Sequence, residues 1–371
     1  MSTWILRMEA SGRGPRVGIK DLIDVAGTPT TGGSAVLAAV AEPALVDAAC
    51  LRGLRAADAA IVGKTNLHEL ACGGTGVNPH FGTPVNPIDA ALIPGGSSSG
   101  NAVALAREEV DLAIGTDTAG SIRTPSACCG TVGLKTTWGR IPVEGVWPLA
   151  PSLDTLGPMA RDVAGVIAGM ALLEPGFDAA TSTAPVIGRV RVPQVDPLID
   201  AAVDRLLATA DIEVVEIALP GWDAAMDAGW AVMHAEVWAV DGELYERDAA
   251  GLGADVRARL EAGRAMSPAA YRAGLAHRAV WRAELAAVFD RAPVLAWPTL
   301  ATFPTPVDAP APNTRRTNIG VNLAGHPSLA LPAPSGGPLP ASVQLVARDH
   351  AEDLLCATAL VLEGAARSLK S

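Results

Sequence analysis

Residues 93–135 read IPGGSSSGNAVALAREEVDLAIGTDTAGSIRTPSACCGTVGLK, and the rest of the chain is organised around this stretch. Two serine sites lie among its glycines, one at 97–99 and one at Ser121. Glycine lets a backbone amide come close to a substrate, and both sites fall at expected turns. Between them the pattern predicts a helix over 101–109 and a short buried strand over 112–114. The stretch therefore predicts a site at which two turns present hydroxyl groups.

Two motifs in this stretch resemble those of a known family. They are Gly-Gly-Ser-Ser at 95–98 and Gly-Thr-Asp-Thr-Ala-Gly-Ser-Ile-Arg at 115–123. Together they resemble the amidase signature family, the Ser-cisSer-Lys amidases, and in particular its compact members that cleave indole-3-acetamide. Similar segments elsewhere are VGIKD at 17–21, GKTN at 63–66, FGTPVNP at 81–87, GLK at 133–135 and SLDTLGP at 152–158, with weaker matches in NLAGHP at 322–327 and VQLV at 343–346. The resemblance is strong over residues 17–162 and weak between about 163 and 290.

The composition is that of a globular chain with a large core, since 49% of its 371 residues are hydrophobic and 18% are charged. The 28 Lys and Arg residues against 39 Asp and Glu residues give a formal net charge of −11. This charge argues against nucleic acid or an anionic membrane as a partner. The N-terminus lacks the apolar core of a secretion signal, and the longest uncharged span, 317–347, is broken by Pro and Gly. We therefore expect a cytoplasmic protein.

No metal or organic cofactor is expected. A phosphate-binding loop around Lys64 would need glycine at position 58, which holds Asp58. A zinc-protease motif that begins at His68 would need a second histidine at position 72, which holds Cys72. The five cysteines show no CxxC spacing, so free thiols are the simplest interpretation.

The remaining pattern predicts an α/β fold. Strands are expected over 17–23, 61–63, 186–192, 212–217, 294–297, 328–331 and 342–346. Helices are expected over 44–59, 161–173, 197–209 with Asp196 as N-cap, 351–362, and two or three times between 222 and 287. This alternation favours one large sheet, mixed and mostly parallel, between two layers of helices. The resemblance implies the same architecture.

We expect a single domain over residues 1–371. Its parts would be a motif-bearing core at about 17–162, a variable region that lines the substrate pocket at about 163–315, and closing strands and a helix at 316–371. The most proline-rich stretch, Pro304–Pro312, is expected to be a surface loop near the pocket.

Amide hydrolysis needs a nucleophile, a base, an acid for the leaving nitrogen and donors for the oxyanion. The resemblance implies that Ser121 is the nucleophile, Ser97 a bridging serine and Lys20 the final base, with a cis peptide bond before Ser97. An ordinary lysine, with a pKa of about 10.4, is almost fully charged at pH 7, so Lys20 must be buried to act as a base. The structural alternatives are a helix N-cap for Ser121 and, for Lys20, an ion pair with Asp21, Asp24 or Glu69.

The residues around Ser121 are expected to bind the oxyanion and to hold the turn. The amides of Thr118, Ala119, Gly120 and Ser121 stand where the family binds the oxyanion. Ala119 replaces a more usual glycine, and alanine enters positive φ only at a cost, so we expect αR or β backbone there. Asp117 and Arg123 are expected to tie the turn to the core. For Arg123 an ordinary surface ion pair is an equally good interpretation.

Two further residues belong to the candidate site. Ser98 is expected to support the turn that presents Ser97. Cys72 stands where relatives often place a methionine that lines the pocket, and a buried thiol without a basic neighbour is inert. The tryptophans are either core residues or, in one or two cases, an apolar wall for an aromatic or short acyl amide. The candidates are Trp138, Trp147, Trp230, Trp238 and Trp297.

These features predict hydrolysis of a small-molecule amide to a carboxylic acid and ammonia through an acyl-enzyme, by a chain that could form a homodimer. One alternative is the amidase-like subunit of a multi-subunit amidotransferase. Another is a hydrolase of ureido amides such as biuret or allophanate, because residues 116–121 also resemble that group. A remote one is an α/β-hydrolase with Ser98 as nucleophile, since residues 96–100 match G-x-S-x-G. Pro94 interrupts the strand that this last interpretation needs.

Overall fold

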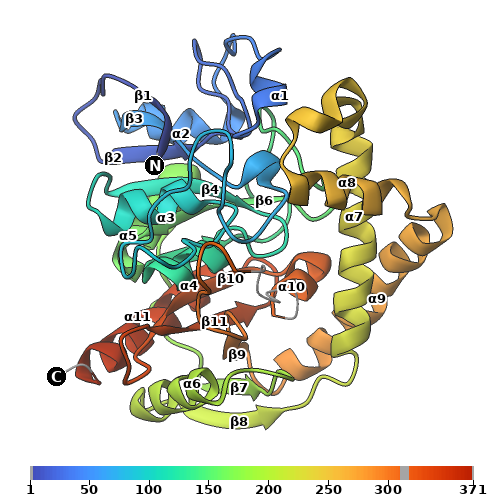
Figure 1. The fold of residues 1–371 in the computed structure, drawn as a ribbon. Coiled ribbons are helices and arrows are strands. Elements are labelled where there is room, and N and C mark those ends of the chain that lie inside the picture. Colours follow the sequence, from blue (N-terminus) through green and yellow to red (C-terminus); the bar gives the residue numbers. More distant parts are fainter. Residues whose placement is uncertain (1–2, 310–316, 370–371) are drawn as a thin grey trace.

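A mixed sheet of eleven strands runs through the computed structural model, which describes residues 3–309 and 317–369 (Figure 1). The strands are β1 (Trp4–Arg7), β2 (Arg16–Lys20), β3 (Ala60–Thr65), β4 (Leu112–Asp117), β5 (Val132–Lys135), β6 (Thr155–Ala160), β7 (Val186–Val190), β8 (Glu213–Ile217), β9 (Val294–Pro298), β10 (Ser328–Ala333) and β11 (Ala341–Ala347). Their order across the sheet is β1-β3-β2-β4-β6-β5-β10-β11-β9-β7-β8.

The sheet is mixed, as expected. The prediction that most neighbouring strands pair in parallel is wrong. Four neighbouring pairs are parallel and six are antiparallel. The reason lies in the connections. β5 is followed by β6, and β10 by β11, with no α-helix between them. Strands joined in this way pair antiparallel, because a parallel pair needs a long crossover.

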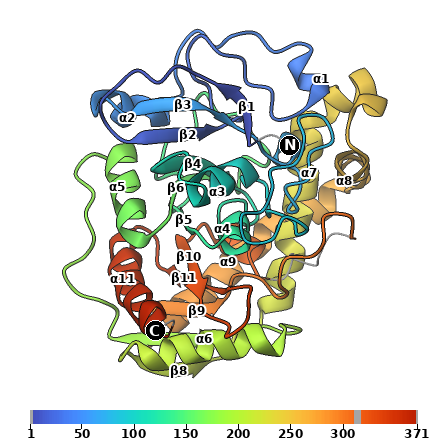
Figure 2. The ribbon, with the colours of Figure 1, turned by 60° about the vertical axis from the view of Figure 1, so that its left-hand side comes forward.

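Helices cover both faces of the sheet. They are α1 (Ala35–Ala38), α2 (Arg52–Ala56), α3 (Ser99–Ala106), α4 (Arg123–Cys129), α5 (Val163–Leu173), α6 (Pro197–Thr209), α7 (Trp222–Asp248), α8 (Ala254–Arg264), α9 (Pro268–Phe289), α10 (Ile319–Ala324) and α11 (Glu352–Ser368). One core packs the sheet against α2, α5, α6 and α11, while α3, α4 and α7 to α10 pack on the other side. Figure 2 shows α5 and α11 opposite α7 and α8. No helix of the described part combines the length and apolarity needed to cross a bilayer.

Alternation along single strands explains the two layers. In β4, Leu112 and Ile114 enter the core formed with α5, whereas Ala113 enters the core formed with α3 and α4. Successive side chains of a strand point to opposite faces, so a strand that is apolar at every position must be covered on both sides.

Several predicted elements are confirmed. The helix α6 spans 197–209, and the Asp196 carboxylate accepts a hydrogen bond from the Leu198 amide as its N-cap. Three helices, α7 to α9, lie in the region where two or three were expected. The N-terminus of α9 is capped by the Ser267 hydroxyl, which accepts a hydrogen bond from the Ala270 amide.

The predicted helix over 44–59 is wrong over half of its length. Only a 3-10 turn, Ala49–Leu51, and the short α2 form there. The backbone before them pairs with the loop at 24–29 instead, since the Ala44 amide donates to the Thr28 carbonyl and the Ala48 amide donates to the Asp24 carbonyl. Of the predicted proline-rich loop, residues 304–309 are irregular apart from one bridge between Leu92 and Pro306, and the remainder lies outside the described residues.

The order of strands places the candidate site. β2 ends at Lys20 and pairs in parallel with β4, which ends at Asp117. The carboxyl ends of parallel neighbours meet at one edge of a sheet, so Lys20 lies beside the turn that leads to Ser121. The N-termini of α3 and α4, which follow the two serine turns, complete this edge.

Candidate active site

Lys20 is fully buried and contacts two hydroxyl groups. Its Nζ donates to Ser97 Oγ at 2.7 Å and to Thr116 Oγ1 at 2.8 Å. Burial lowers the pKa of Lys20 to about 7, although the carboxylates of Asp117 and Asp154 act to raise it. Both the neutral and the charged form are therefore accessible near neutral pH, as a proton acceptor requires.

The carboxylates considered as ion-pair partners of Lys20 are held elsewhere. Asp21 forms a buried ion pair with Lys64, with 2.8 Å between Oδ1 and Nζ. The carboxylate at position 24 accepts a hydrogen bond from Thr30, and that at position 69 lies 3.2 Å from His80. The ion-pair interpretation of Lys20 is wrong.

Ser97 begins the turn that leads into α3. The Gly96–Ser97 peptide bond is cis, as the resemblance implied. The Ser97 carbonyl accepts from the His68 amide at 3.0 Å, which ties this turn to the loop after β3. Its hydroxyl is hydrogen-bonded to the Lys20 amine, so Ser97 is placed to pass a proton to that amine.

Ser98 joins the two serine turns. Its amide donates to the Ser121 carbonyl at 3.1 Å, and its hydroxyl donates to the Thr116 carbonyl at 3.4 Å. The supporting position expected for Ser98 agrees with these contacts. Residues 90–93 form no strand, only a bridge from Leu92 to Pro306. A nucleophile elbow needs a strand, a turn and a helix, so the α/β-hydrolase alternative is not supported.

Ser121 lies in the turn between β4 and α4. The Asp117 carboxylate holds this turn, because Oδ1 accepts from the Gly120 amide at 2.8 Å and Oδ2 from the Ile122 amide at 3.1 Å. Gly120 has φ +112°, and a Cβ there would lie 2.8 Å from the Asn318 side chain, so only glycine fits. Ile122 occupies the N-cap position of α4. The N-cap interpretation of Ser121 is therefore wrong.

The expected oxyanion donors are not equivalent. The Gly120 amide is already bound within the turn, so Gly120 stabilises the turn instead of offering a free donor. Within residues 3–309 and 317–369, the amides of Ala119 and Ser121 donate to no protein acceptor. Ala119 stays out of the left-handed region, as expected. Thr118 contributes its hydroxyl, which donates to Asp154 at 2.6 Å.

Asp117 and Arg123 form a fully buried ion pair, with 2.9 Å between Oδ1 and Nη2. The surface interpretation of Arg123 is thus wrong. Asn322 bridges the pair, accepting from Arg123 at 2.6 Å and donating to Asp117 at 2.9 Å, while Gln344 accepts from Arg123 at 2.9 Å. Burial acts to raise the pKa of Asp117, but Arg123 and Lys135 hold it below its ordinary value. The turn is therefore fixed by a permanent charge.

Four residues of this arrangement received no role from the sequence: Thr116, Asp154, Asn322 and Gln344. All four lie in segments that carried the family resemblance. Gln344 lies within the buried strand predicted over 342–346, and Thr116 lies just after the one predicted over 112–114. A polar side chain in a buried strand must find a hydrogen-bond partner. That signal could have identified both.

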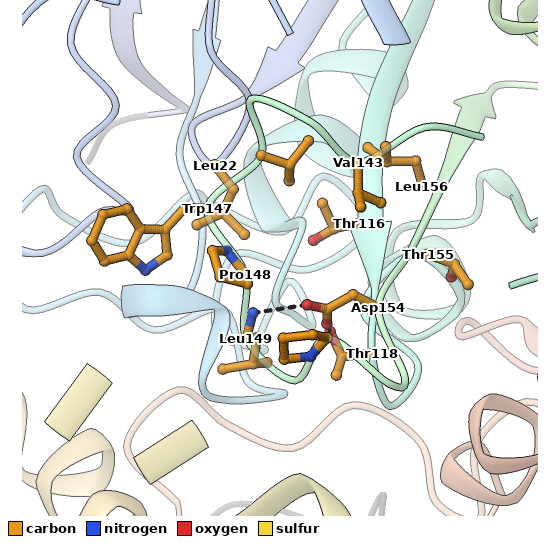
Figure 3. A pocket seen from close by; sticks show the side chains of 12 residues that line it. Leu22, Thr116, Thr118, Val143, Trp147, Pro148, Leu149, Asp154, Thr155 and Leu156 are labelled. Atoms are coloured by element: carbon orange, nitrogen blue, oxygen red, sulfur yellow. Dashed lines mark hydrogen bonds between the residues drawn. The ribbon is translucent and has the colours of Figure 1, made fainter. Parts of the chain in front are cut away.

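A cavity of about 70 Å³ adjoins the end of β4 (Figure 3). Thr116, Thr118 and Asp154 are on its wall, and the other lining side chains are almost all apolar, Trp147 among them. Figure 3 shows the Leu149 amide donating to Asp154. Burial raises the pKa of Asp154, although the hydrogen bonds that its carboxylate accepts from Thr118 and Leu149 act to lower it. No basic side chain of the described residues lines this cavity.

Of the five tryptophans considered, Trp147 lines this cavity, and its Nε1 donates to Asp241 at 3.1 Å. Trp297 is a core residue, 1% exposed, and packs edge-on against Trp222. Cys72 is not on the cavity wall; it is packed among apolar side chains, and burial raises its pKa to about 12. All five cysteines are free, as predicted, and all are buried. In the part of the chain described, no three His, Cys, Asp or Glu residues are grouped to hold a metal ion.

Comparison with known proteins finds relatives along most of the chain. A family model described as Amidase matches residues 14–191 and 179–356. The chain is 33% identical over 407 residues to a glutamyl-tRNA(Gln) amidotransferase subunit from Halobacterium salinarum, in a match that covers 94% of this chain and 95% of the relative. It is 35% identical over 381 residues to a 2-amino-5-chloromuconic acid deaminase from Comamonas testosteroni, with 94% and 80% covered.

A solved crystal structure of an amidase superposes with a TM-score of 0.87 at 29% identity, covering 95% of this chain and 86% of that one. The family match thus extends well beyond the strongly similar residues 17–162, into the region where the motifs are weak. The chain belongs to the amidase signature family and is a hydrolase that acts on C–N amide bonds.

Proposed function

We propose that the protein cleaves a small carboxamide to a carboxylic acid and ammonia through a Ser-Ser-Lys relay. The observation that carries this proposal is the 2.7 Å hydrogen bond between Lys20 and Ser97 in a buried site. The turn that holds Ser121 is joined to the turn at Ser97 by the hydrogen bond from the Ser98 amide to the Ser121 carbonyl. A lysine with a lowered pKa beside a serine hydroxyl is a base coupled to a proton relay.

In this mechanism Ser121 Oγ attacks the carbonyl carbon of the amide. Its proton passes to Ser97, whose own proton passes to neutral Lys20. The amides of Ala119 and Ser121 donate to the oxyanion that forms. The C–N bond then breaks, the relay returns its proton to the leaving nitrogen, and ammonia departs. Water attacks the acyl-enzyme by the same relay, which releases the carboxylic acid and restores Ser121.

We assign the acyl group of the substrate to the cavity beside β4, whose wall includes Thr116 and Thr118 but not Ser121, and this cavity favours a short aliphatic acyl group. Its volume of about 70 Å³ is smaller than the ~150 Å³ of an apolar protein cavity that holds benzene. Its lining is mostly apolar, and the carboxylate of Asp154 is satisfied internally by hydrogen bonds. An aromatic acyl group is too large for this space. The carboxylate of a ureido acid would find no basic partner among the described lining residues.

A substrate screen with the purified chain alone tests this proposal. Ammonia release would be measured with propionamide, isobutyramide, benzamide, indole-3-acetamide, biuret, allophanate and glutamine. We expect turnover of the short aliphatic amides, and none with the Ser121→Ala variant. Preference for allophanate would refute the aliphatic assignment while leaving the relay intact.

A second function is favoured by one observation, the 33% identity to the glutamyl-tRNA(Gln) amidotransferase subunit over nearly the whole of both chains. A chain of this kind would release ammonia from glutamine only together with partner subunits. Inactivity of the isolated chain toward every amide, and activity with glutamine once such partners are added, would establish this alternative. Sedimentation of the isolated chain would test the predicted homodimer.

A further inference from the structure

A second cavity, of about 220 Å³, lies against α9 and α10. Figure 1 shows these two helices beside α7, on the lower right of the molecule. Its wall includes Trp138, Arg278, Arg282, Asn322 and Asp349. None of these residues lines the cavity of Figure 3. The two spaces are separate, and the relay described above makes no use of the second one.

The cavity wall carries an arginine without a paired carboxylate. Arg278 and Arg282 are four residues apart on α9, so they lie on one face of that helix. Arg282 pairs with Asp349 at 2.5 Å. Arg278 donates to the Ser152 carbonyl at 2.9 Å, and its Nε is buried without an acceptor. Among the described residues no carboxylate lies within ion-pair distance of Arg278.

The surroundings balance this positive charge only in part, because Glu236 acts on it without forming an ion pair. Burial lowers the pKa of Arg278. The nearby carboxylate of Glu236 acts to raise this pKa, and the charge of Arg282 lowers it further. The Glu236 carboxylate is occupied, because it accepts from the Ser152 hydroxyl at 2.6 Å and from the Tyr271 hydroxyl at 2.9 Å. A half-buried cation with unsatisfied donors gains free energy from an anion that reaches it.

A flat aromatic side chain forms another part of the wall. Trp138 is 48% exposed, yet it is held in place, since its Nε1 donates to the Pro151 carbonyl at 3.2 Å and its amide donates to the Gly325 carbonyl at 2.9 Å. An exposed indole fixed at a cavity wall offers a surface for a planar apolar group.

We propose that this cavity binds a small aromatic carboxylate, with its carboxylate group on Arg278, beside the Arg282–Asp349 pair, and its ring against Trp138. The planar guanidinium matches a carboxylate in two-point geometry. The volume of about 220 Å³ exceeds the ~150 Å³ of a cavity that holds benzene. A molecule of the size of benzoate therefore fits.

Asn322 connects this cavity with the nucleophile turn. It lines the cavity, and its side chain amide bonds both Asp117 and Arg123. A ligand that shifts Asn322 also shifts the hydrogen bonds that hold the turn. We therefore expect occupancy of the cavity to change the rate of amide hydrolysis.

Titration calorimetry with benzoate tests the proposal without relying on catalysis. Arg278→Met and Arg282→Met remove one lining guanidinium each, and Arg272→Met removes an exposed one from the same helix as a matched control. Loss of a charge-assisted hydrogen bond should raise the Kd of benzoate about tenfold to a hundredfold in Arg278→Met. Arg272→Met should bind as the wild type does.

Arg278→Lys retains the charge without the planar fork, so it should bind with intermediate affinity and shows that weaker binding is not misfolding. Equal affinity in the wild type and Arg278→Met would overturn the proposal, as would the absence of benzoate binding to the wild type. Inorganic phosphate that binds as tightly as benzoate would overturn the assignment to a planar carboxylate. Displacement of benzoate by the amide substrate would place benzoate in the catalytic cavity instead and overturn it too.

Discussion

Replacing Lys20 by methionine should inactivate the enzyme and stabilise it at the same time. The pKa of Lys20 falls from 10.5 to about 7 through burial. Each pKa unit corresponds to about 1.36 kcal/mol, so holding this amine in the folded state costs about 5 kcal/mol well below pH 7. Methionine removes that cost but also loses the hydrogen bonds to Ser97 and Thr116, at about 1 kcal/mol each. The net gain is about 3 kcal/mol.

The sign of the pH dependence follows from proton counting. Between about pH 7 and pH 10.5 the unfolded chain holds a proton on Lys20 that the folded chain has released. The free energy of unfolding of the wild type therefore rises with pH across this window. The advantage of Lys20→Met is largest below pH 7, vanishes near pH 9, where the cost of burial has fallen to the ~2 kcal/mol of the lost hydrogen bonds, and reverses at higher pH.

Urea unfolding at pH 6.5, 8 and 9.5 measures the stability, and ammonia release measures kcat/KM. The loss of a general base predicts a fall in kcat/KM of about a hundredfold to ten-thousandfold. In the wild type, kcat/KM should rise with pH through about 7, with about a tenth of the plateau value left at pH 6.

Lys135→Met is the matched control. Lys135 is equally buried, and its pKa is lowered to about 7, mainly by burial and also by the charge of Arg123. Its Nζ, however, donates to the Thr136 carbonyl and contacts neither serine. This variant should also be stabilised, though less than Lys20→Met because the charge of Lys135 favours the Asp117 carboxylate, and it should keep most of its activity. A Lys20→Met protein that is less stable than the wild type at pH 7, with an unchanged pH slope, would refute the account of its burial. An unaltered kcat/KM would remove Lys20 from the relay.

Four other outcomes are expected. Ser121→Ala should abolish turnover and the acyl-enzyme seen by intact-protein mass spectrometry, whereas Ser98→Ala should lose far less; the reverse order would contradict the assignment of the nucleophile. Arg123→Met leaves its carboxylate partner buried and unpaired, so urea unfolding should show a loss of about 3–5 kcal/mol, against about 0–1 kcal/mol for Arg16→Met in an exposed pair. Trp147→Leu enlarges the cavity of Figure 3, so steady-state kinetics should show a shift of kcat/KM from propionamide toward benzamide, and an unchanged ratio would separate that cavity from the acyl group. Prolonged dialysis against EDTA should leave ammonia release unaltered, and activity lost and then restored by zinc would contradict the relay.

The elements that the sequence predicted well are those set by local interactions. Asp196 followed by Pro197 marks the start of α6 because both residues act within the first turn of that helix. The cis bond before Ser97 and the contact between Lys20 and Ser97 followed from a motif resemblance, which encodes geometry that no local pattern reveals.

The errors arose where distant segments decide the outcome. Residues 44–48 have apolar periodicity typical of a helix, but their backbone pairs with the loop at 24–29. The parallel majority failed because pairing depends on which connections contain a helix. The burial of Arg123 could not be read from its own neighbourhood, since its partners Asn322 and Gln344 lie 199 and 221 residues further along the chain.

Those long separations determine when the enzyme can become active during its synthesis. Domains fold as the chain emerges from its N-terminus, and distant contacts form last. A ribosome-bound chain that has emerged only through α4 already contains Lys20, Ser97 and Ser121, but it lacks the side chains that fix the Asp117–Arg123 pair. The nucleophile turn is completed only when β11 has been added to the sheet. We therefore expect the nascent chain to hydrolyse amides only after β11 has emerged and joined the sheet.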